Sequence, residues 1–227
     1  MWAVFKKELK SYFLSPVGYV VIGIFLLFFS VMFYLTAFIA GSVDLGGLYY
    51  YTAAWGLIII VPILTMRMFA EERKNGTEQL LLTSPTGMFS VVIGKFLAAM
   101  VVILITLILS FMFFGILSYF GDPNIAVTFV QIFGFILMSM AAISIGMLAS
   151  SLTENQIIAV VITGAFLILS LFIGGISEAL SGLTLIDYYL NFTQGVIQIE
   201  NVISLLLFTF VFISLTIIVM KRRKLVK

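Results

Sequence analysis

The residues best suited to chemistry lie in one short polar segment, residues 70–86, which reads AEERKNGTEQLLLTSPT. Its charged residues are Glu71, Glu72, Arg73, Lys74 and Glu78. Glu71 and Glu72 could pair with Arg73 or Lys74, or with basic groups on a partner. Breaking a desolvated charge pair at an interface costs about 2–5 kcal/mol. The segment therefore predicts a charged contact surface rather than a catalytic site.

The same segment has the pattern of a turn followed by a short helix. Asn75-Gly76 is a turn signal, and Glu78 suits the first turn of a helix, where a negative charge is favoured. Three leucines follow, and Pro85 ends the element. Because a plain connection needs only about two to eight residues, we predict a docking helix. Its expected contact residues are Glu71, Glu72, Gly76, Glu78 and Leu81.

Most other reactive chemistry is excluded by residue type. The chain of 227 residues has no histidine and no cysteine, which excludes imidazole-based triads, thiol nucleophiles and Cys/His zinc sites. The nearest candidate for a phosphate loop, Gly87 to Lys95, has too many residues between its glycines and Phe96 where Ser or Thr is needed. We therefore expect no catalytic residue, metal, cofactor or nucleotide in this chain, and no nucleic-acid partner.

The composition is that of a membrane protein. Apolar residues make up 63% of the chain and charged residues 10%, against about 45–50% and about 25% in soluble domains. A membrane helix needs about 20 apolar residues, and charge-free runs of that length predict an all-α integral membrane protein, formed as a single domain over residues 1–227. The six predicted spans are residues 17–40, 50–69, 91–120, 126–150, 156–175 and 202–220.

The basic residues orient these spans. With six spans, all 12 lysines and arginines fall on the side that holds both termini and residues 70–86. The opposite side carries only acidic residues, namely Asp44, Asp122, Glu178, Asp187 and Glu200. Because lysine and arginine are retained on the cytoplasmic side, we predict a multi-pass protein of the cytoplasmic membrane with cytoplasmic N- and C-termini.

Charge is missing from the middle of every predicted span. Arg67 and Lys95 lie near cytoplasmic ends, where long side chains are expected to extend toward the membrane surface. Charged groups at mid-membrane depth typically mark proton relays and ion paths. The pattern therefore disfavours proton-coupled transport by this chain alone.

Three further patterns concern helix placement. In residues 1–15, aromatic and leucine side chains recur every three or four positions opposite three lysines, which predicts an interfacial helix that contacts lipid on the inner leaflet. Residues 177–201 are too short to span and too apolar for a free loop, so we expect an outer re-entrant segment. Ala142, Gly146 and Ser150 recur at a spacing of four, which favours close helix packing.

Several of these stretches resemble ABC-2 type transporter permeases. The resemblance lies in residues 5–13 (FKKELKSYF), 15–19 (SPVGY) and 66–85 (MRMFAEERKNGTEQLLLTSP), and in Asn191-Phe192 with Gly195-Val196-Ile197. It covers essentially the whole chain, and residues 66–85 are its most specific part. The chain is most similar to the branch with the gliding-motility-associated and nitrous-oxide-reductase-maturation permeases.

The resemblance implies six helices in the type V exporter arrangement, with an N-terminal connecting helix and a coupling helix in residues 70–86. It also implies a bacterial location, a second permease copy or paralogue, and separate ABC ATPase subunits that hold ATP and Mg. The second and fifth spans would line the dimer interface or translocation path. The candidate residues there are Tyr51, Trp55, Ile59, Ile158, Ile162 and Phe166.

Two other functions stay open from sequence. One is a stand-alone secondary carrier or channel, which the charge-free spans and the docking segment disfavour. The other is a membrane scaffold or assembly factor that transports nothing. Retention of an ATPase on purification would separate the permease from both.

Overall fold

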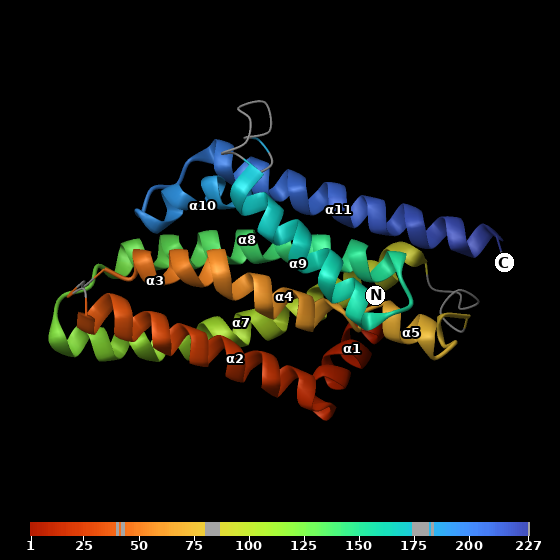
Figure 1. Cartoon of the computed structure of the whole chain (residues 1–227), viewed down its shortest axis with the longest axis horizontal. Coiled ribbons are helices and arrows are strands. Elements are labelled where there is room, and N and C mark those ends of the chain that lie inside the picture. The colour runs from red at the N-terminus through yellow and green to blue at the C-terminus, as the bar shows by residue number, and fades with distance from the viewer. Residues whose placement is uncertain (40, 42–43, 80–86, 174–181, 183, 227) are drawn as a thin grey trace.

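The computed structural model describes residues 1–39, 41, 44–79, 87–173, 182 and 184–226, and every regular element in these ranges is a helix (Figure 1). The all-α prediction is thereby confirmed. The helices are α1 (Trp2–Leu14), α2 (Pro16–Phe33), α3 (Gly46–Tyr51), α4 (Leu57–Thr65), α5 (Ala70–Lys74), α7 (Met88–Phe120), α8 (Ile125–Leu152), α9 (Gln156–Phe172), α10 (Leu185–Thr193) and α11 (Ile199–Val226). Two π-helical stretches, η1 (Tyr34–Ile39) and η2 (Thr52–Gly56), extend α2 and join α3 to α4.

Five helical stretches within the described residues are long and apolar enough to cross a membrane: Pro16–Ile39, Gly46–Lys74, Met88–Phe120, Ile125–Leu152 and Ile199–Arg223. The predicted span 156–175 corresponds to α9, which is shorter, and its last two residues lie outside the described part of the chain. A six-span topology therefore stays a prediction.

Local sequence explains where several helices begin. Pro16 opens α2, a position where its missing N–H costs no hydrogen bond and its fixed φ already suits a helix. Asn124 caps α8 by accepting a hydrogen bond from the Ala126 N–H at 3.0 Å. Asn155 caps α9 in the same way, with the Ile157 N–H at 2.9 Å.

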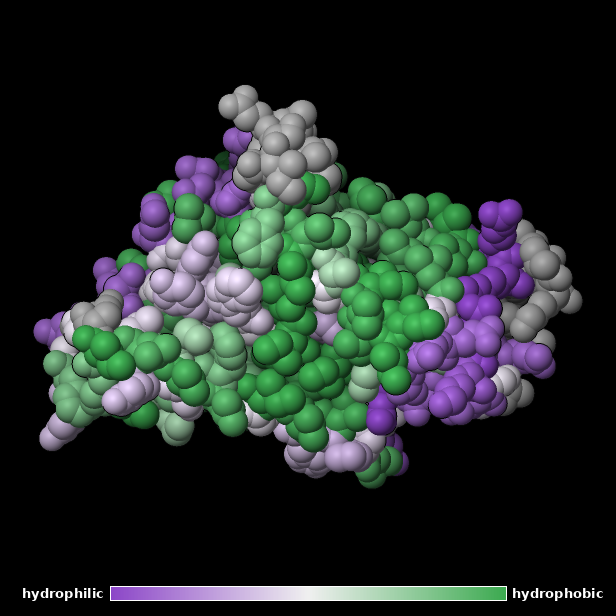
Figure 2. Space-filling model, viewed as in Figure 1, coloured by the Kyte–Doolittle hydropathy of each residue, from purple (hydrophilic) through white to green (hydrophobic). Residues whose placement is uncertain are grey.

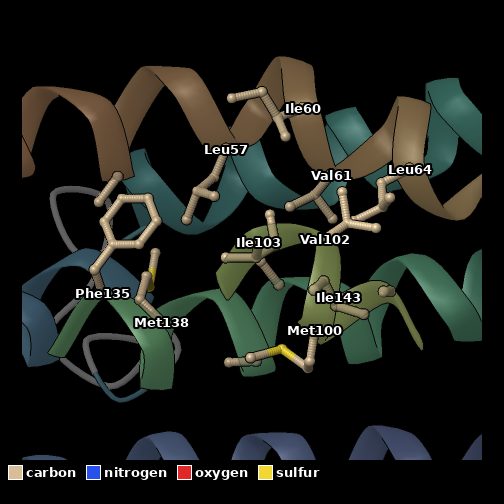
Figure 3. Close-up of a cluster of buried hydrophobic side chains, with 14 of the residues drawn as sticks. Leu57, Ile60, Val61, Leu64, Met100, Val102, Ile103, Phe135, Met138 and Ile143 are labelled. Atoms are coloured by element: carbon tan, nitrogen blue, oxygen red, sulfur yellow. The ribbon is translucent and has the colours of Figure 1, made fainter. Parts of the chain in front are cut away.

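The helix α8 is the most buried of the five spans. It packs against α4, α7, α9, α10 and α11, and it lies in the middle of the bundle (Figure 1). The contact with α4 and α7 is apolar, formed by side chains such as Val61, Ile103 and Ile143 (Figure 3). This core positions the rest of the molecule.

Small residues of α8 allow α4 to approach closely, as their spacing predicted. A Cβ added to Gly146 would stand 2.3 Å from Oγ1 of Thr65, so only glycine fits at this crossing. One turn further, the Ser150 hydroxyl accepts hydrogen bonds from the N–H groups of Phe69 at 3.1 Å and Ala70 at 3.2 Å. The end of α4 and the start of α5 are thus fastened to α8.

At the opposite end, the fully buried Gln131 of α8 connects two other segments. Its Nε2 donates to Asp44 Oδ1 at 3.1 Å and to the Thr193 carbonyl at 3.0 Å. The helix α10 therefore packs on α8 within the region predicted to be re-entrant. Within that region, residues 177–181 and 183 lie outside the described residues.

The surface separates into an apolar middle and polar ends (Figure 2). Both termini and α5 lie toward one end of the long axis (Figure 1), and the most hydrophilic surface gathers there over α5 and the last turns of α11 (Figure 2). Large hydrophobic side chains such as Ile108 and Phe210 are about 70% exposed, at 72% and 69%. Such a band is the surface expected of a protein solvated by lipid.

We expect the substitution Gly146→Ala to lower the melting temperature of the detergent-solubilised protein, because the added methyl group meets Thr65. Overpacking of this kind typically costs about 1–3 kcal/mol. The matched control is Gly115→Ala on α7, where nothing lies within 4 Å of the added Cβ and alanine is the better helix former. Equal melting temperatures for the two variants would contradict the close crossing of α4 and α8.

Candidate functional site

Four charged side chains from three helices meet beside the N-terminal helix. We call them the charged cluster: Lys7 and Glu8 of α1, Glu72 of α5 and Lys95 of α7. The Lys95 Nζ lies 3.0 Å from Glu8 Oε1 and 3.0 Å from Glu72 Oε1. The Lys7 Nζ lies 3.3 Å from Glu72 Oε1 and 3.6 Å from Glu8 Oε1. The cluster therefore balances two positive charges with two negative ones.

Lys95 is the centre of the charged cluster, because its side chain is only 1% exposed. Lys95 lies two turns after the start of α7. Its ammonium is also 5.3 Å from the centre of the Phe69 ring, which is a favourable position for a cation. Removing one partner from a buried ion pair leaves an uncompensated charge and is strongly destabilising. Lys95 thus depends on Glu8 and Glu72 to neutralise its buried charge.

The residue before Lys95 explains how α1 comes close enough. A Cβ added to Gly94 would stand 3.2 Å from the Phe5 backbone nitrogen and from the Val4 side chain, so α1 lies almost directly on the α7 backbone. The Gly94-Lys95 pair, which is a poor phosphate loop by sequence, is the site where α1 packs.

A second contact joins α1 to the end of α4. The buried Tyr12 hydroxyl donates to the Leu64 carbonyl at 3.1 Å. Burial, together with the nearby Glu8 charge, raises the pKa of Tyr12 well above its usual range, so the phenol stays protonated as a donor.

Burial lowers the pKa of Lys7, but Glu72 and Glu8 raise it more, and the net pKa lies above the ordinary value. The Lys7 ammonium therefore stays charged at neutral pH.

Two further ion pairs join residues 70–79 to other helices. Arg73 Nη2 lies 2.7 Å from Glu154 Oε1, in the connection between α8 and α9. Arg223 Nη1 of α11 lies 3.3 Å from Glu78 Oε1. With the Ser150 hydrogen bonds, this segment is attached to α1, α7, α8, the α8–α9 connection and α11.

The predicted docking residues differ in their surroundings. Glu71 is 39% exposed and lies 3.8 Å from Arg67, whereas the side chains of Glu72 and Glu78 are only 14% and 8% exposed. Gly76 has φ +71°, which confirms the turn. Leu81 lies outside the described residues. The sequence suggested Arg73 or Lys74 as partners of Glu71 and Glu72; the structure pairs them with Arg67, Lys7 and Lys95 instead.

Sequence reasoning missed Glu8 and Lys95 as functional candidates. It placed Lys95 at a span end with its side chain extended toward the surface, but the structure buries that side chain within the charged cluster. The available signal was an isolated lysine inside an apolar run. Such a group needs a carboxylate partner wherever the fold can supply one.

The six predicted path residues are all exposed in the isolated chain. Tyr51, Trp55 and Ile59 are 45–48% exposed on α3, η2 and α4, and Ile158, Ile162 and Phe166 are 37–48% exposed on α9. The helices α4 and α9 pack side by side, and apolar surface covers this part of the molecule (Figure 2). These side chains are therefore available to a partner or to lipid.

The charged cluster predicts a large stability difference between two lysine substitutions. We expect Lys95→Gln to lower the free energy of unfolding by about 3 kcal/mol or more, because Glu8 and Glu72 lose the partner that neutralises them. The control is Lys10→Gln on the exposed face of α1, which should change it by about 0.5 kcal/mol or less. Unfolding in mixed micelles measures both, and similar values would contradict a structural role for the cluster.

Comparison with known proteins agrees with this architecture. The sequence model described as "ABC-2 family transporter protein" matches residues 49–216, which is most of the chain and runs from α3 into α11. No curated protein matches the chain significantly. The matched range contains Glu72 and Lys95, while Lys7 and Glu8 precede it. The chain thus belongs to the ABC-2 transporter family, whose members are the membrane permeases of ABC transporters.

Proposed function

We propose that this chain is the permease subunit of an ABC exporter in the bacterial cytoplasmic membrane, with ATP and Mg bound by separate ATPase subunits. Family membership and the apolar spans support a membrane permease. The observation that carries the ATP-driven part is the attachment of residues 70–79 by ion pairs to α1, α7, the α8–α9 connection and α11. A force applied to this segment would therefore reach several spans at once.

The contacts show which helices a movement of α5 would reach. Glu72 transmits a displacement of α5 to α1 and α7 through Lys7 and Lys95. Arg73 connects α5 with the start of α9 through Glu154. Separating α5 from α7 would leave the buried Lys95 without its Glu72 partner, so these helices are expected to move together. The Arg73–Glu154 pair, 29% and 62% exposed, adds a weaker contact that solvent screens.

Within this proposal, Glu71 and Gly76 lie where an ATPase would touch the chain. Glu71 keeps substantial exposure, and Gly76 forms a turn in which a side chain would be strained. Leu81, beyond the described residues, would complete the contact. Glu72 and Glu78 then act from behind this surface as positioning residues, because their carboxylates are already paired within the chain.

The proposed subunit works as a dimer of two identical chains or of two paralogues. The exposed faces of α3–α4 and α9, with Tyr51, Trp55, Ile59, Ile158, Ile162 and Phe166, would meet across the dimer axis or line the path. We further propose six spans in the type V arrangement, with termini in the cytoplasm. The assignment to the gliding-motility and nitrous-oxide-reductase-maturation branch rests on the resemblance of residues 5–19, 66–85 and 191–197.

Glu71 gives the sharpest test of ATPase coupling. We expect Glu71→Gln to reduce the ATPase that is retained by the tagged chain from native membranes by about tenfold, as expected for loss of a desolvated interface charge. The protein alone should keep its melting temperature. Glu72→Gln is unsuitable here because it also breaks the charged cluster.

The matched control for Glu71→Gln is Glu200→Gln, an exposed glutamate at the start of α11, near the opposite end of the molecule. It should retain the ATPase fully. If no ATPase accompanies even the unchanged chain, a stand-alone carrier or a scaffold becomes the better interpretation.

Cross-linking tests the dimer. Because the chain has no cysteine, Trp55→Cys and Ile162→Cys each introduce a single thiol, and we expect at least one to form a cross-linked dimer under mild oxidation in native membranes. Ile108→Cys, which is 72% exposed on α7, is the control and should stay monomeric. Dimers from Ile108→Cys alone would place the interface on another face.

A further inference from the structure

A cavity of about 450 Å³ opens beside the charged cluster, between α1, the start of α2 and the segment from α4 to α5. Its volume is in the range of small-molecule sites. Its wall carries six charged side chains, three basic and three acidic: Lys7, Arg67, Lys95, Glu8, Glu71 and Glu72. Neutral polar side chains such as Ser11 and Asn75 also line it. The transport function proposed above uses Glu71 and Glu72 of this wall but assigns no ligand to the cavity itself.

The wall of the cavity carries both signs of charge on side chains that a ligand can reach. Lys7 is 62% exposed, and Arg67 and Glu71 are 38% and 39% exposed. Arg67 and Glu71 are 3.8 Å apart, beyond hydrogen-bond distance. Arg67 can therefore donate to an anionic group of a ligand and Glu71 can accept from a cationic one. The two side chains would still neutralise each other's charge.

Two buried atoms of the wall lack hydrogen-bond partners within the described part of the chain: Arg67 Nε and Glu72 Oε2. One is a donor and the other an acceptor. Buried polar atoms are normally paired, and both side chains border the cavity. A ligand that brings an anionic acceptor and a cationic donor would fit the spare capacity of both.

Two exposed hydrophobic side chains lie close in sequence to cavity-lining residues at the junction of α1 and α2. Ser15 and Val17 line the cavity, and the neighbouring Leu14 and Tyr19 are 78% and 62% exposed. An exposed leucine and tyrosine at the end of an amphipathic helix are typical of the membrane surface. A ligand in the cavity can therefore place an acyl chain on this surface.

We propose that the cavity binds the headgroup of an aminophospholipid of the ethanolamine type. Its phosphate lies between Lys7 and Arg67, and its primary ammonium donates to Glu71 and Glu72. The acyl chains extend along Leu14 and Tyr19. A choline headgroup has no N–H to donate, and a glycerol headgroup donates only from neutral hydroxyl groups, so both would bind the carboxylates more weakly.

The test measures lipid binding to the purified, delipidated full chain by native mass spectrometry, without any ATPase. Phosphatidylethanolamine, phosphatidylcholine and phosphatidylglycerol with identical acyl chains are compared. We expect the ethanolamine lipid to bind about tenfold more tightly than either of the others, the difference expected for a hydrogen bond between charged groups. Equal affinities, or no binding, would overturn the proposal. Competition by soluble phosphoethanolamine at the affinity of the lipid would overturn its assignment as a lipid site.

Two variants separate the two halves of the headgroup. Arg67→Gln should weaken the ethanolamine and choline lipids alike, by about tenfold, because both carry the phosphate. Glu71→Gln should remove the preference for ethanolamine over choline and leave choline binding unchanged. The control Lys10→Gln, on α1 but outside the cavity lining, should bind like the unchanged chain. Unaltered elution on size exclusion shows that each variant is folded. Unaltered lipid affinity in folded Arg67→Gln protein, or unaltered lipid selectivity in folded Glu71→Gln protein, would contradict the site.

Discussion

A lysine ammonium that is almost wholly removed from solvent must be neutralised where it lies. Lys95 is such a group, and the two carboxylates that neutralise it come from α1 and α5, 87 residues and 23 residues away along the chain. The N-terminal helix, the segment after α4 and the start of α7 are consequently held in one arrangement. Gly94 makes the approach of α1 possible, and Tyr12 extends the attachment to the end of α4. The cavity beside α1 exists because these contacts keep α1 in this position.

The helix bundle next to the charged cluster is stabilised by close packing more than by the burial of apolar surface. Lipid is as apolar as the side chains, so helices in a membrane associate through van der Waals contact and interhelical hydrogen bonds. The helix α8 supplies both. Gly146 allows α4 to approach, Ser150 holds the residues between α4 and α5, and Gln131 joins the segments at the other end. The central helix thereby connects the charged end of the molecule with the opposite one.

The charged cluster and the packing around α8 explain why different residues of the segment 70–79 are proposed to transmit movement and to contact the ATPase. Glu72, Arg73 and Glu78 are paired within the chain, so they can transmit movement. Glu71 and the turn at Gly76 face outward, so they can receive it. The same outward position gives Glu71 a place in the wall of the cavity, where a lipid headgroup would lie beside the segment that the ATPase is proposed to move.

Helix type, the long apolar stretches, the uneven distribution of lysine and arginine, and the turn at Gly76 could all be predicted from sequence, because composition, periodicity and turn preference act over neighbouring residues. The close packing of α8 at Ala142, Gly146 and Ser150 was predicted for the same reason. The partners of the charged residues were not. Glu71 and Glu72 were expected to pair with Arg73 or Lys74 or with a partner protein, and Lys95 was expected at the membrane surface. Only the tertiary structure brings Glu8, Glu72 and Lys95 together and buries Glu78 against Arg223, because pairing between residues far apart in the chain depends on which helices meet.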